Sequence, residues 1–232
     1  GMVMVHMTAL TLYLHALRVP EDGAGTYIAI SGILALLAAT KYSMLVVKPQ
    51  SAWAMLSVRD RSFLENVVIP LYPAFFCVPA AVAHQSLLLG FASTASLLAA
   101  LGFGVAAYPF CYCIGWNSED ELVRTTAACG LGLATFIALR YFQMDSFYLK
   151  PFAAPVSVLG GMGHYLGLLI SSDAWHWRRR DGQRLYLKYN VAMVGSLLGS
   201  IFAGQMLGLA GLTNTAITFG VLWVVDKTRE LQ

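Results

Sequence analysis

The chain has 232 residues, of which 58% are hydrophobic and only 12% are charged, and its formal net charge is +3. An average soluble domain has about 25% charged residues, so this composition leaves too little polar surface for a water-soluble globule. The charge is small and no long basic arm or nucleic-acid-binding motif is present, which argues against a nucleic-acid partner.

Long apolar runs alternate with short polar connections along the sequence. This pattern predicts an all-α polytopic bundle of transmembrane helices, forming a single integral membrane domain over residues 1–232. One helical span needs about 20 apolar residues, and the uncharged stretch over residues 66–118 is long enough for two. In chain order, eight spans are predicted at residues 2–18, 25–47, 66–83, 87–115, 122–142, 152–172, 190–208 and 212–226.

Two of these segments affect the span count. The first run ends at Arg18 without a small-residue cleavage site, so it is predicted to be a span rather than a signal peptide. The third run contains Pro70, Pro73 and Pro79, and proline interrupts helical hydrogen bonding. Seven spans plus a re-entrant segment is therefore the alternative to eight.

The distribution of cations supports eight spans with both termini on the cytoplasmic, stromal or matrix side. Loops on that side of a membrane are enriched in Lys and Arg. With eight spans, three cations, Arg18, Arg140 and Lys150, lie on the opposite side. The side of the termini has eleven: Lys48, Arg59, Arg61, Arg124, Arg178, Arg179, Arg180, Arg184, Lys188, Lys227 and Arg229.

Two connections are predicted to have local structure. Residues 48–65 are expected to include a short interfacial helix that turns Trp53 and its apolar neighbours towards lipid. The acidic sequence Glu119 to Glu121 precedes the fifth span, where it would complement the positive end of the helix dipole, with Asn117 or Ser118 as the N-cap.

The sixth span ends in aromatic residues followed by a basic cluster. Tryptophan is suited to the headgroup layer, and clustered Arg and Lys attract anionic lipids. We therefore predict that this segment contacts anionic headgroups or a partner through Trp175, Trp177, Arg178, Arg179, Arg180, Arg184 and Lys188.

Small residues recur at helical spacing in the sixth and seventh spans. Such faces let helix backbones approach closely in lipid, where dispersion contacts drive association. The glycines predicted to serve helix packing are Gly163, Gly167, Gly195, Gly199, Gly204 and Gly208.

The sequence contains little that indicates catalysis. All twelve carboxylates lie in predicted loops or at span ends, which disfavours a proton- or sodium-coupled carrier, because such carriers keep an acidic group at membrane depth. Metal-ligand pairs, nucleophile elbows and phosphate-binding loops are missing. The last apolar run has no lysine before Lys227, which excludes a retinal Schiff base there. No metal, cofactor or catalytic residue is predicted, and bound lipid is the only expected ligand.

These features lead us to expect a non-catalytic integral membrane protein, an accessory, scaffold or assembly subunit of a larger membrane complex with other membrane subunits and lipids as partners. The alternative is a facilitative channel or transporter for a small neutral or anionic solute, with Tyr72, His84 and His164 lining its path. A second alternative is a lipid-acting enzyme at the basic face, with Asp173, His176 and Asp181 as its only candidate groups.

Overall fold

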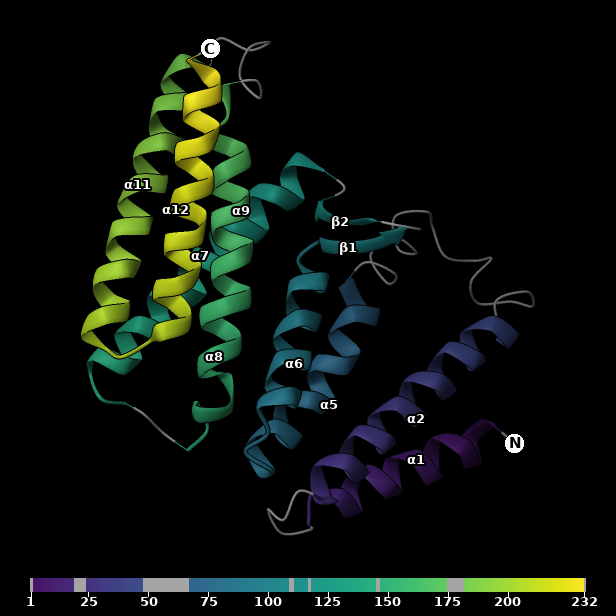
Figure 1. Ribbon diagram of the computed structural model, residues 1–232. Helices are drawn as coiled ribbons and strands as arrows, with labels where there is room; N and C mark the ends of the chain where they lie inside the picture. Colours follow the sequence, from purple (N-terminus) through teal and green to yellow (C-terminus); the bar gives the residue numbers. More distant parts are fainter. Residues whose placement is uncertain are drawn as a thin grey trace. The chain divides into compact units, whose positions relative to one another are not determined.

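The computed structural model describes residues 2–18, 24–47, 67–108, 111–116, 118–144, 147–174 and 182–231. These residues are mostly helical, as the sequence predicts, and they include one two-stranded sheet (Figure 1). The chain divides into two compact units, Gly1–Ala100 with Ser146–Phe152, and Leu101–Asp145 with Ala153–Gln232. Each unit is described by itself.

The first unit consists of two helical pairs. α1 packs against α2, α5 packs against α6, and the short 3₁₀ turn η2 lies on α6. The core between the helices is rich in alanine, which allows the backbones to approach, and the Tyr13 hydroxyl donates a 2.8 Å hydrogen bond to the Phe76 carbonyl. This bond connects α1 to α5. The elements are α1 (Met2–Ala16), α2 (Ala24–Val47), α5 (Ile69–Ala83), α6 (Leu87–Ala100) and η2 (Lys150–Phe152).

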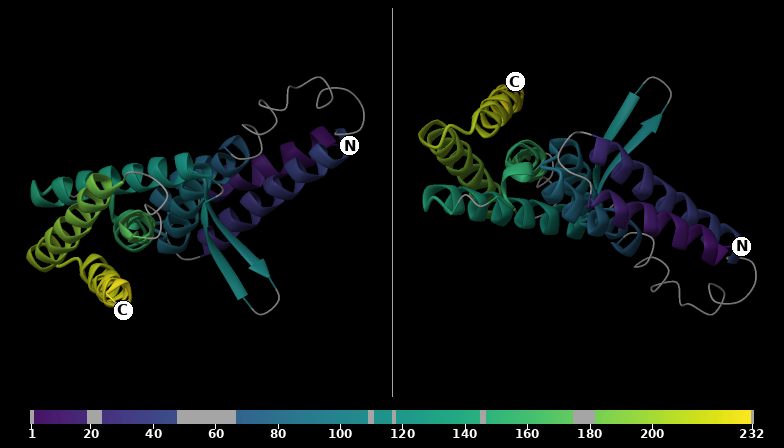
Figure 2. Two further views of the ribbon diagram at one scale, coloured as in Figure 1. Left: turned by 90° about the horizontal axis from the view of Figure 1, so that it is seen from above. Right: turned by 90° about the horizontal axis from the view of Figure 1, so that it is seen from below.

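The second unit is organised around α9. This helix contacts α7, α11 and α12, and the views of Figure 2 show it nearly end-on among them. Its fully buried Tyr165 packs with Met193 of α11 and Phe219 of α12. The helical elements are α7 (Glu119–Tyr141), α8 (Ala153–Pro155), the π-helical turn η3 (Val156–Gly160), α9 (Gly161–Ser172), α11 (Gln183–Met206) and α12 (Ala210–Glu230).

α7 begins as the sequence predicts. The Ser118 hydroxyl accepts a 3.2 Å hydrogen bond from the Glu121 backbone N–H. Glu119, Asp120 and Glu121 occupy the first turn, where negative charge stabilises the helix.

The predicted continuous helix over residues 87–115 is wrong. α6 ends at Ala100, and an antiparallel hairpin follows, in which β1 (Phe103–Tyr108) pairs with β2 (Cys111–Trp116). Gly102 has a φ of +100°, a conformation that side chains disfavour and that cannot continue a helix. The strands are rich in aromatic and β-branched residues, and strand pairing satisfies their backbone groups. Hydrophobicity alone did not distinguish this hairpin from a helix.

Eight spans are also not supported. In the described residues, three helical segments are long and apolar enough to cross a membrane: Glu119–Tyr141, Lys150–Ser172 and Gln183–Met206. Shorter apolar helices cover Ala24–Thr40, Ile69–Ala83 and Leu87–Ala100. α12 is long enough, but Asn214 and its neighbouring threonines dilute its apolar run. The predicted connector helix over residues 48–65 lies outside the described residues.

The second unit has an apolar outside and polar groups inside. Leu131, Leu198 and Phe202 are each more than 60% exposed, whereas Thr125 and Ser172 are fully buried. Water would disfavour such an exterior, whereas hydrocarbon favours it and provides no hydrogen-bond partners for polar groups. This arrangement suits a membrane-embedded bundle.

The glycines predicted to serve helix packing have different environments. Gly163 is buried, a Cβ at Gly167 would lie 2.9 Å from Thr126 Cβ on α7, and a Cβ at Gly204 would lie 3.1 Å from the Thr213 nitrogen on α12. A Cβ at Gly195 or Gly199 would meet nothing within 4 Å. Gly208 has a φ of +66° in the turn after α11, so its conformation requires glycine there.

We expect Gly167→Ala to destabilise the second unit, because the added methyl group would separate α7 from α9. Overpacking of this kind costs about 1–3 kcal/mol. Thermal unfolding in detergent should show a lower midpoint for this variant. Gly195→Ala is the matched control and should unfold at or above the wild-type temperature, since its methyl group enters open space and alanine favours helix. Equal midpoints for the two variants would contradict the observed α7–α9 packing.

Candidate functional site

A polar junction between helices of the second unit centres on His164 of α9. Its Nδ1 lies 2.9 Å from the Thr126 backbone oxygen on α7, and its Nε2 lies 2.8 Å from Ser196 Oγ on α11. A carbonyl oxygen only accepts, so Nδ1 must donate, and in the neutral ring Nε2 accepts a hydrogen bond from the Ser196 hydroxyl. One imidazole therefore joins three helices.

Gly130 on α7 makes room for this ring. A Cβ at residue 130 would lie 2.7 Å from His164 Cε1, closer than side chains approach one another. Gly130 thus has a packing role, because the absence of a side chain there allows the imidazole to reach the α7 backbone.

Beside this junction, the Tyr165 hydroxyl is buried without a hydrogen-bond partner. The Ser196 and Ser200 hydroxyls lie near it, but neither meets the geometry of a hydrogen bond with it. An unmade hydrogen bond on a buried hydroxyl costs about 1–3 kcal/mol, so this donor is available to any acceptor placed beside Ser196.

The junction lies deep in the bundle. Ser196 follows Lys188 by eight residues along α11, which places it about 12 Å farther along the helix axis. The centre of a bilayer is about 15 Å from the edge of its hydrocarbon core. His164 and Ser196 are therefore expected near the middle of the membrane, and of these two the sequence predicted only His164, as part of a solute path.

The three residues of the predicted solute path belong to different units. Tyr72 packs against the core of the first unit, and His84 ends α5 in the same unit, where both of its ring nitrogens are buried without partners. His164 belongs to the second unit. The path remains a prediction.

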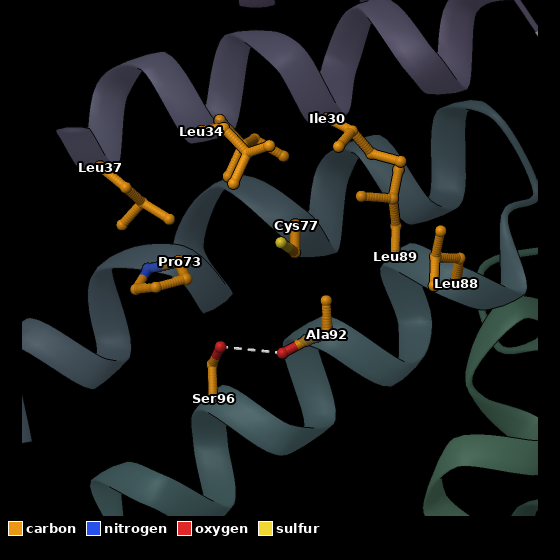
Figure 3. Close-up of a pocket in the computed structure, with 10 residues that line it drawn as sticks. Ile30, Leu34, Leu37, Pro73, Cys77, Leu88, Leu89, Ala92 and Ser96 are labelled. Carbon is orange, nitrogen blue, oxygen red and sulfur yellow. Dashed lines mark hydrogen bonds between the residues drawn. The ribbon is translucent and has the colours of Figure 1, made fainter.

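An apolar groove lies in the first unit between α2, α5 and α6 (Figure 3). Its volume is about 420 Å³, and its walls are formed mainly by Ile, Leu and Pro side chains. The Ser96 hydroxyl at its edge donates to the Ala92 carbonyl at 2.8 Å, so its proton is already engaged. The groove suits an acyl chain better than a polar solute.

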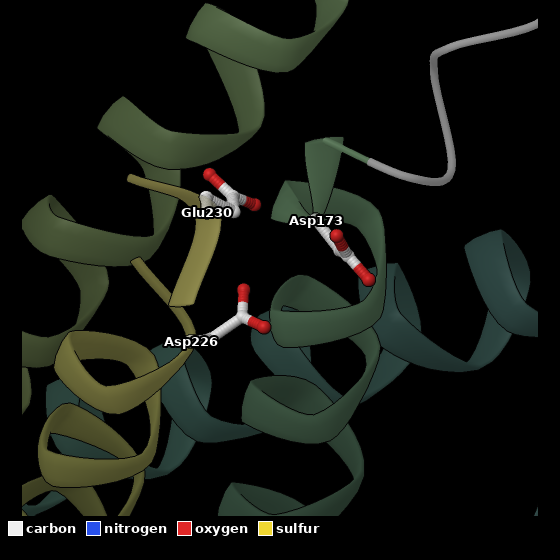
Figure 4. A group of neighbouring side chains, drawn as sticks. All are labelled: Asp173, Asp226 and Glu230. Carbon is white, nitrogen blue, oxygen red and sulfur yellow. The ribbon is translucent and has the colours of Figure 1, made fainter. Parts of the chain in front are cut away.

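A second polar cluster joins the ends of α9 and α12 (Figure 4). Carboxylate oxygens of Asp173, Asp226 and Glu230 lie within 4.8 Å of one another, a set that resembles a cation site. Lys227 Nζ already supplies a positive charge, because it donates to Glu230 Oε1 at 2.6 Å and lies 3.3 Å from Asp226 Oδ2. The same ammonium donates to the Ser172 carbonyl at 2.6 Å. This cluster therefore connects the C-terminal ends of α9 and α12.

Glu230 collects donors from three elements. It accepts hydrogen bonds from the Lys227 ammonium, the Ala174 backbone N–H at 2.8 Å and the Tyr186 hydroxyl at 2.7 Å. Burial raises the pKa of Glu230, but these donors outweigh it and hold the pKa below its ordinary value. Burial likewise lowers the pKa of Lys227, and its bonds to Glu230 outweigh that effect and raise the pKa.

The structure describes part of the predicted headgroup-binding segment. Arg184 and Lys188 lie in the first two turns of α11, and both are exposed. Trp175, Trp177, Arg178, Arg179 and Arg180 lie outside the described residues, as do His176 and Asp181. Contact with anionic headgroups remains a prediction.

Comparison with known proteins adds no homologue: no protein-family model, curated protein or solved structure matches this chain.

Reasoning from the sequence missed Ser196, Thr126 and Lys227 as partners in these clusters. Ser196 and Thr126 lie within apolar runs, and a polar residue there is a signal, but it does not specify which residue on another helix it meets. Lys227 is 55 residues from its acceptor Ser172, so only folding reveals the contact.

We expect Glu230→Gln to lower stability at neutral pH by about 1–3 kcal/mol, the usual contribution of hydrogen bonds to a charged group. Because the folded-state pKa of Glu230 is depressed, the stabilisation is present above the ordinary pKa of 4.5 and is lost as pH falls through the folded value. Thermal unfolding of both proteins in detergent between pH 3 and pH 8 would measure this difference.

The control is Arg229→Gln, since the Arg229 side chain is 73% exposed and its ion pair with Asp226 contributes little. A deficit of Glu230→Gln that stays constant down to the lowest pH would contradict the role of the ionised carboxylate.

Proposed function

We propose that the protein is a multi-pass integral membrane protein with both termini on the cytoplasmic, stromal or matrix side, serving as an accessory, scaffold or assembly subunit of a larger membrane complex. The three helical segments long and apolar enough to cross a membrane support the membrane location. The basic cluster from Arg178 to Lys188 supports placing that connection on the cytoplasmic, stromal or matrix side, because loops there are enriched in Lys and Arg.

The observation that carries the proposal is the open face of α11. Gly167 and Gly204 make close contacts within the second unit, whereas Gly195 and Gly199 lie on an exposed side of α11 with nothing over them. In lipid, such a face lets a second helix approach until backbones touch, and flanking apolar side chains then pack around the contact. Exposed Val191, Leu198 and Phe202 provide those flanks.

Bound lipid fits the same proposal. The apolar groove of the first unit offers dispersion contacts to an acyl chain, and exposed Arg184 and Lys188 offer charge to anionic headgroups. These contacts would anchor a subunit with little extramembrane mass.

We expect the Gly195→Leu/Gly199→Leu variant to lose its partner, because two leucines on this face keep a neighbouring helix at a distance. The measurement is the native mass of the full-length protein purified in mild detergent from its own membrane. Wild type should migrate as a complex. The amount of associated subunit per protein should be at least five-fold lower in the variant.

The matched control is Gly132→Leu on α7, another exposed glycine whose Cβ would meet nothing within 4 Å. It should retain the complex. The subunit proposal would be contradicted if the wild-type protein purified as a monomer, or if both variants lost the associated subunit equally.

A further inference from the structure

The Ser196 hydroxyl differs from most hydroxyls in the described helices. Helical Ser and Thr usually satisfy their hydroxyl on a carbonyl three or four residues earlier in the same helix. Many do so here: Thr8, Thr11, Ser31, Thr40, Thr94, Ser96, Thr126, Ser157, Thr215 and Thr218. Ser196 instead bonds a histidine on another helix, 2.8 Å away.

The histidine is oriented to act as a base. Its Nδ1–H donates to the Thr126 carbonyl, which fixes the tautomer and leaves the Nε2 lone pair directed at the Ser196 hydroxyl. A nucleophile in contact with a base that a third group orients is the arrangement found in serine hydrolases. A carbonyl is a weaker orienting group than a carboxylate, but it adds no buried charge.

A donor and an approach route complete the arrangement. The buried Tyr165 hydroxyl makes no well-formed hydrogen bond and lies near Ser196, so it can donate to an oxygen that becomes negative beside that serine. Gly195 and Gly199 leave the backbone on either side of Ser196 uncovered. A substrate chain can therefore approach from the lipid-exposed side of α11.

We propose that Ser196 and His164 are a nucleophile and general base that hydrolyse peptide bonds in membrane-embedded polypeptide segments. Ser196 Oγ bonds to the carbonyl carbon while its proton passes to His164 Nε2, and Tyr165 stabilises the oxyanion. The C–N bond then breaks, and the leaving nitrogen takes the electron pair and the proton from Nε2, leaving an acyl ester on Ser196. The oxygen of a water molecule then bonds to the acyl carbon while one of its protons passes to His164 Nε2. The ester bond breaks, and Ser196 Oγ takes that proton from Nε2, which regenerates the serine and releases the acid.

The site tolerates the charges that this sequence creates. The imidazolium and the oxyanion form together and lie close to each other, so each offsets the cost of the other in a low-dielectric surrounding. The Thr126 carbonyl remains on Nδ1–H throughout and stabilises the imidazolium.

The depth of Ser196 in the membrane indicates the substrate class. Ser196 is about 12 Å along the helix axis from Lys188, whereas the ester groups of lipids lie at the edge of the hydrocarbon core. The peptide groups of a membrane-embedded segment occur at every depth. Helical carbonyls are occupied by their own hydrogen bonds, so the scissile bond should lie in a stretch opened by glycine or proline.

The test is labelling of the full-length protein in detergent with a fluorophosphonate, which phosphonylates activated serines, followed by peptide mass spectrometry. We expect one adduct on Ser196 of the wild type. Ser196→Ala and His164→Gln should each reduce labelling at least ten-fold, Tyr165→Phe should slow it, and Ser96→Ala, whose hydroxyl bonds its own helix, should label like wild type.

Mapping the adduct on wild type makes the result independent of whether variants fold. An unlabelled Ser196 in the wild type would overturn the proposal, whatever the stability of the variants. The His164 junction would then serve only to hold the three helices together. In vesicles, cleavage of an embedded peptide with a Gly-Pro break would support the substrate class, and release of fatty acid from phosphatidylcholine would overturn it. This activity goes beyond the subunit proposal, and neither test depends on the other.

Discussion

Hydrocarbon offers no hydrogen-bond partner, and the second unit meets this constraint by bonding its polar side chains to helix carbonyls and to one another. The central case is His164, which reaches the Thr126 carbonyl on one helix and the Ser196 hydroxyl on another. The central position of α9 lets its histidine bond to both α7 and α11. Gly130 and Gly167 then allow α7 to approach closely enough for these bonds to form.

The same constraint explains the end of the bundle near α12. Lys227 bonds carboxylates of its own helix and the Ser172 carbonyl at the end of α9, so a charged group helps to satisfy a helix terminus. Asn190 continues this network, since its amide donates to Ser172 O and its oxygen accepts from Trp223. The acidic cluster is thus an intramolecular contact between helix ends, with the Lys227 ammonium bound to two of its three carboxylates.

Two features of α11 remain unexplained by internal packing. Its Gly195 and Gly199 face is uncovered, and its Ser196 hydroxyl is directed at a base rather than at its own backbone. The first suits a neighbouring helix and the second suits an acyl-transfer reaction. Both features lie on adjacent residues, so a chain that docks on this helix comes next to the serine.

Composition and periodicity determined that the chain is mostly helical and suited to a membrane, and the acidic sequence before α7 determined where that helix begins, with Ser118 as its cap. These properties depend on local residue type, which the sequence gives directly. The hairpin after Ala100 was not predictable in the same way, because an apolar run of aromatic and β-branched residues fits a helix or a strand, and the conformation of Gly102 decides between them. The His164 junction was also beyond the sequence. Thr126 and Ser196 lie 38 and 32 residues from His164 along the chain, and only the packing of α7, α9 and α11 decides which polar groups meet.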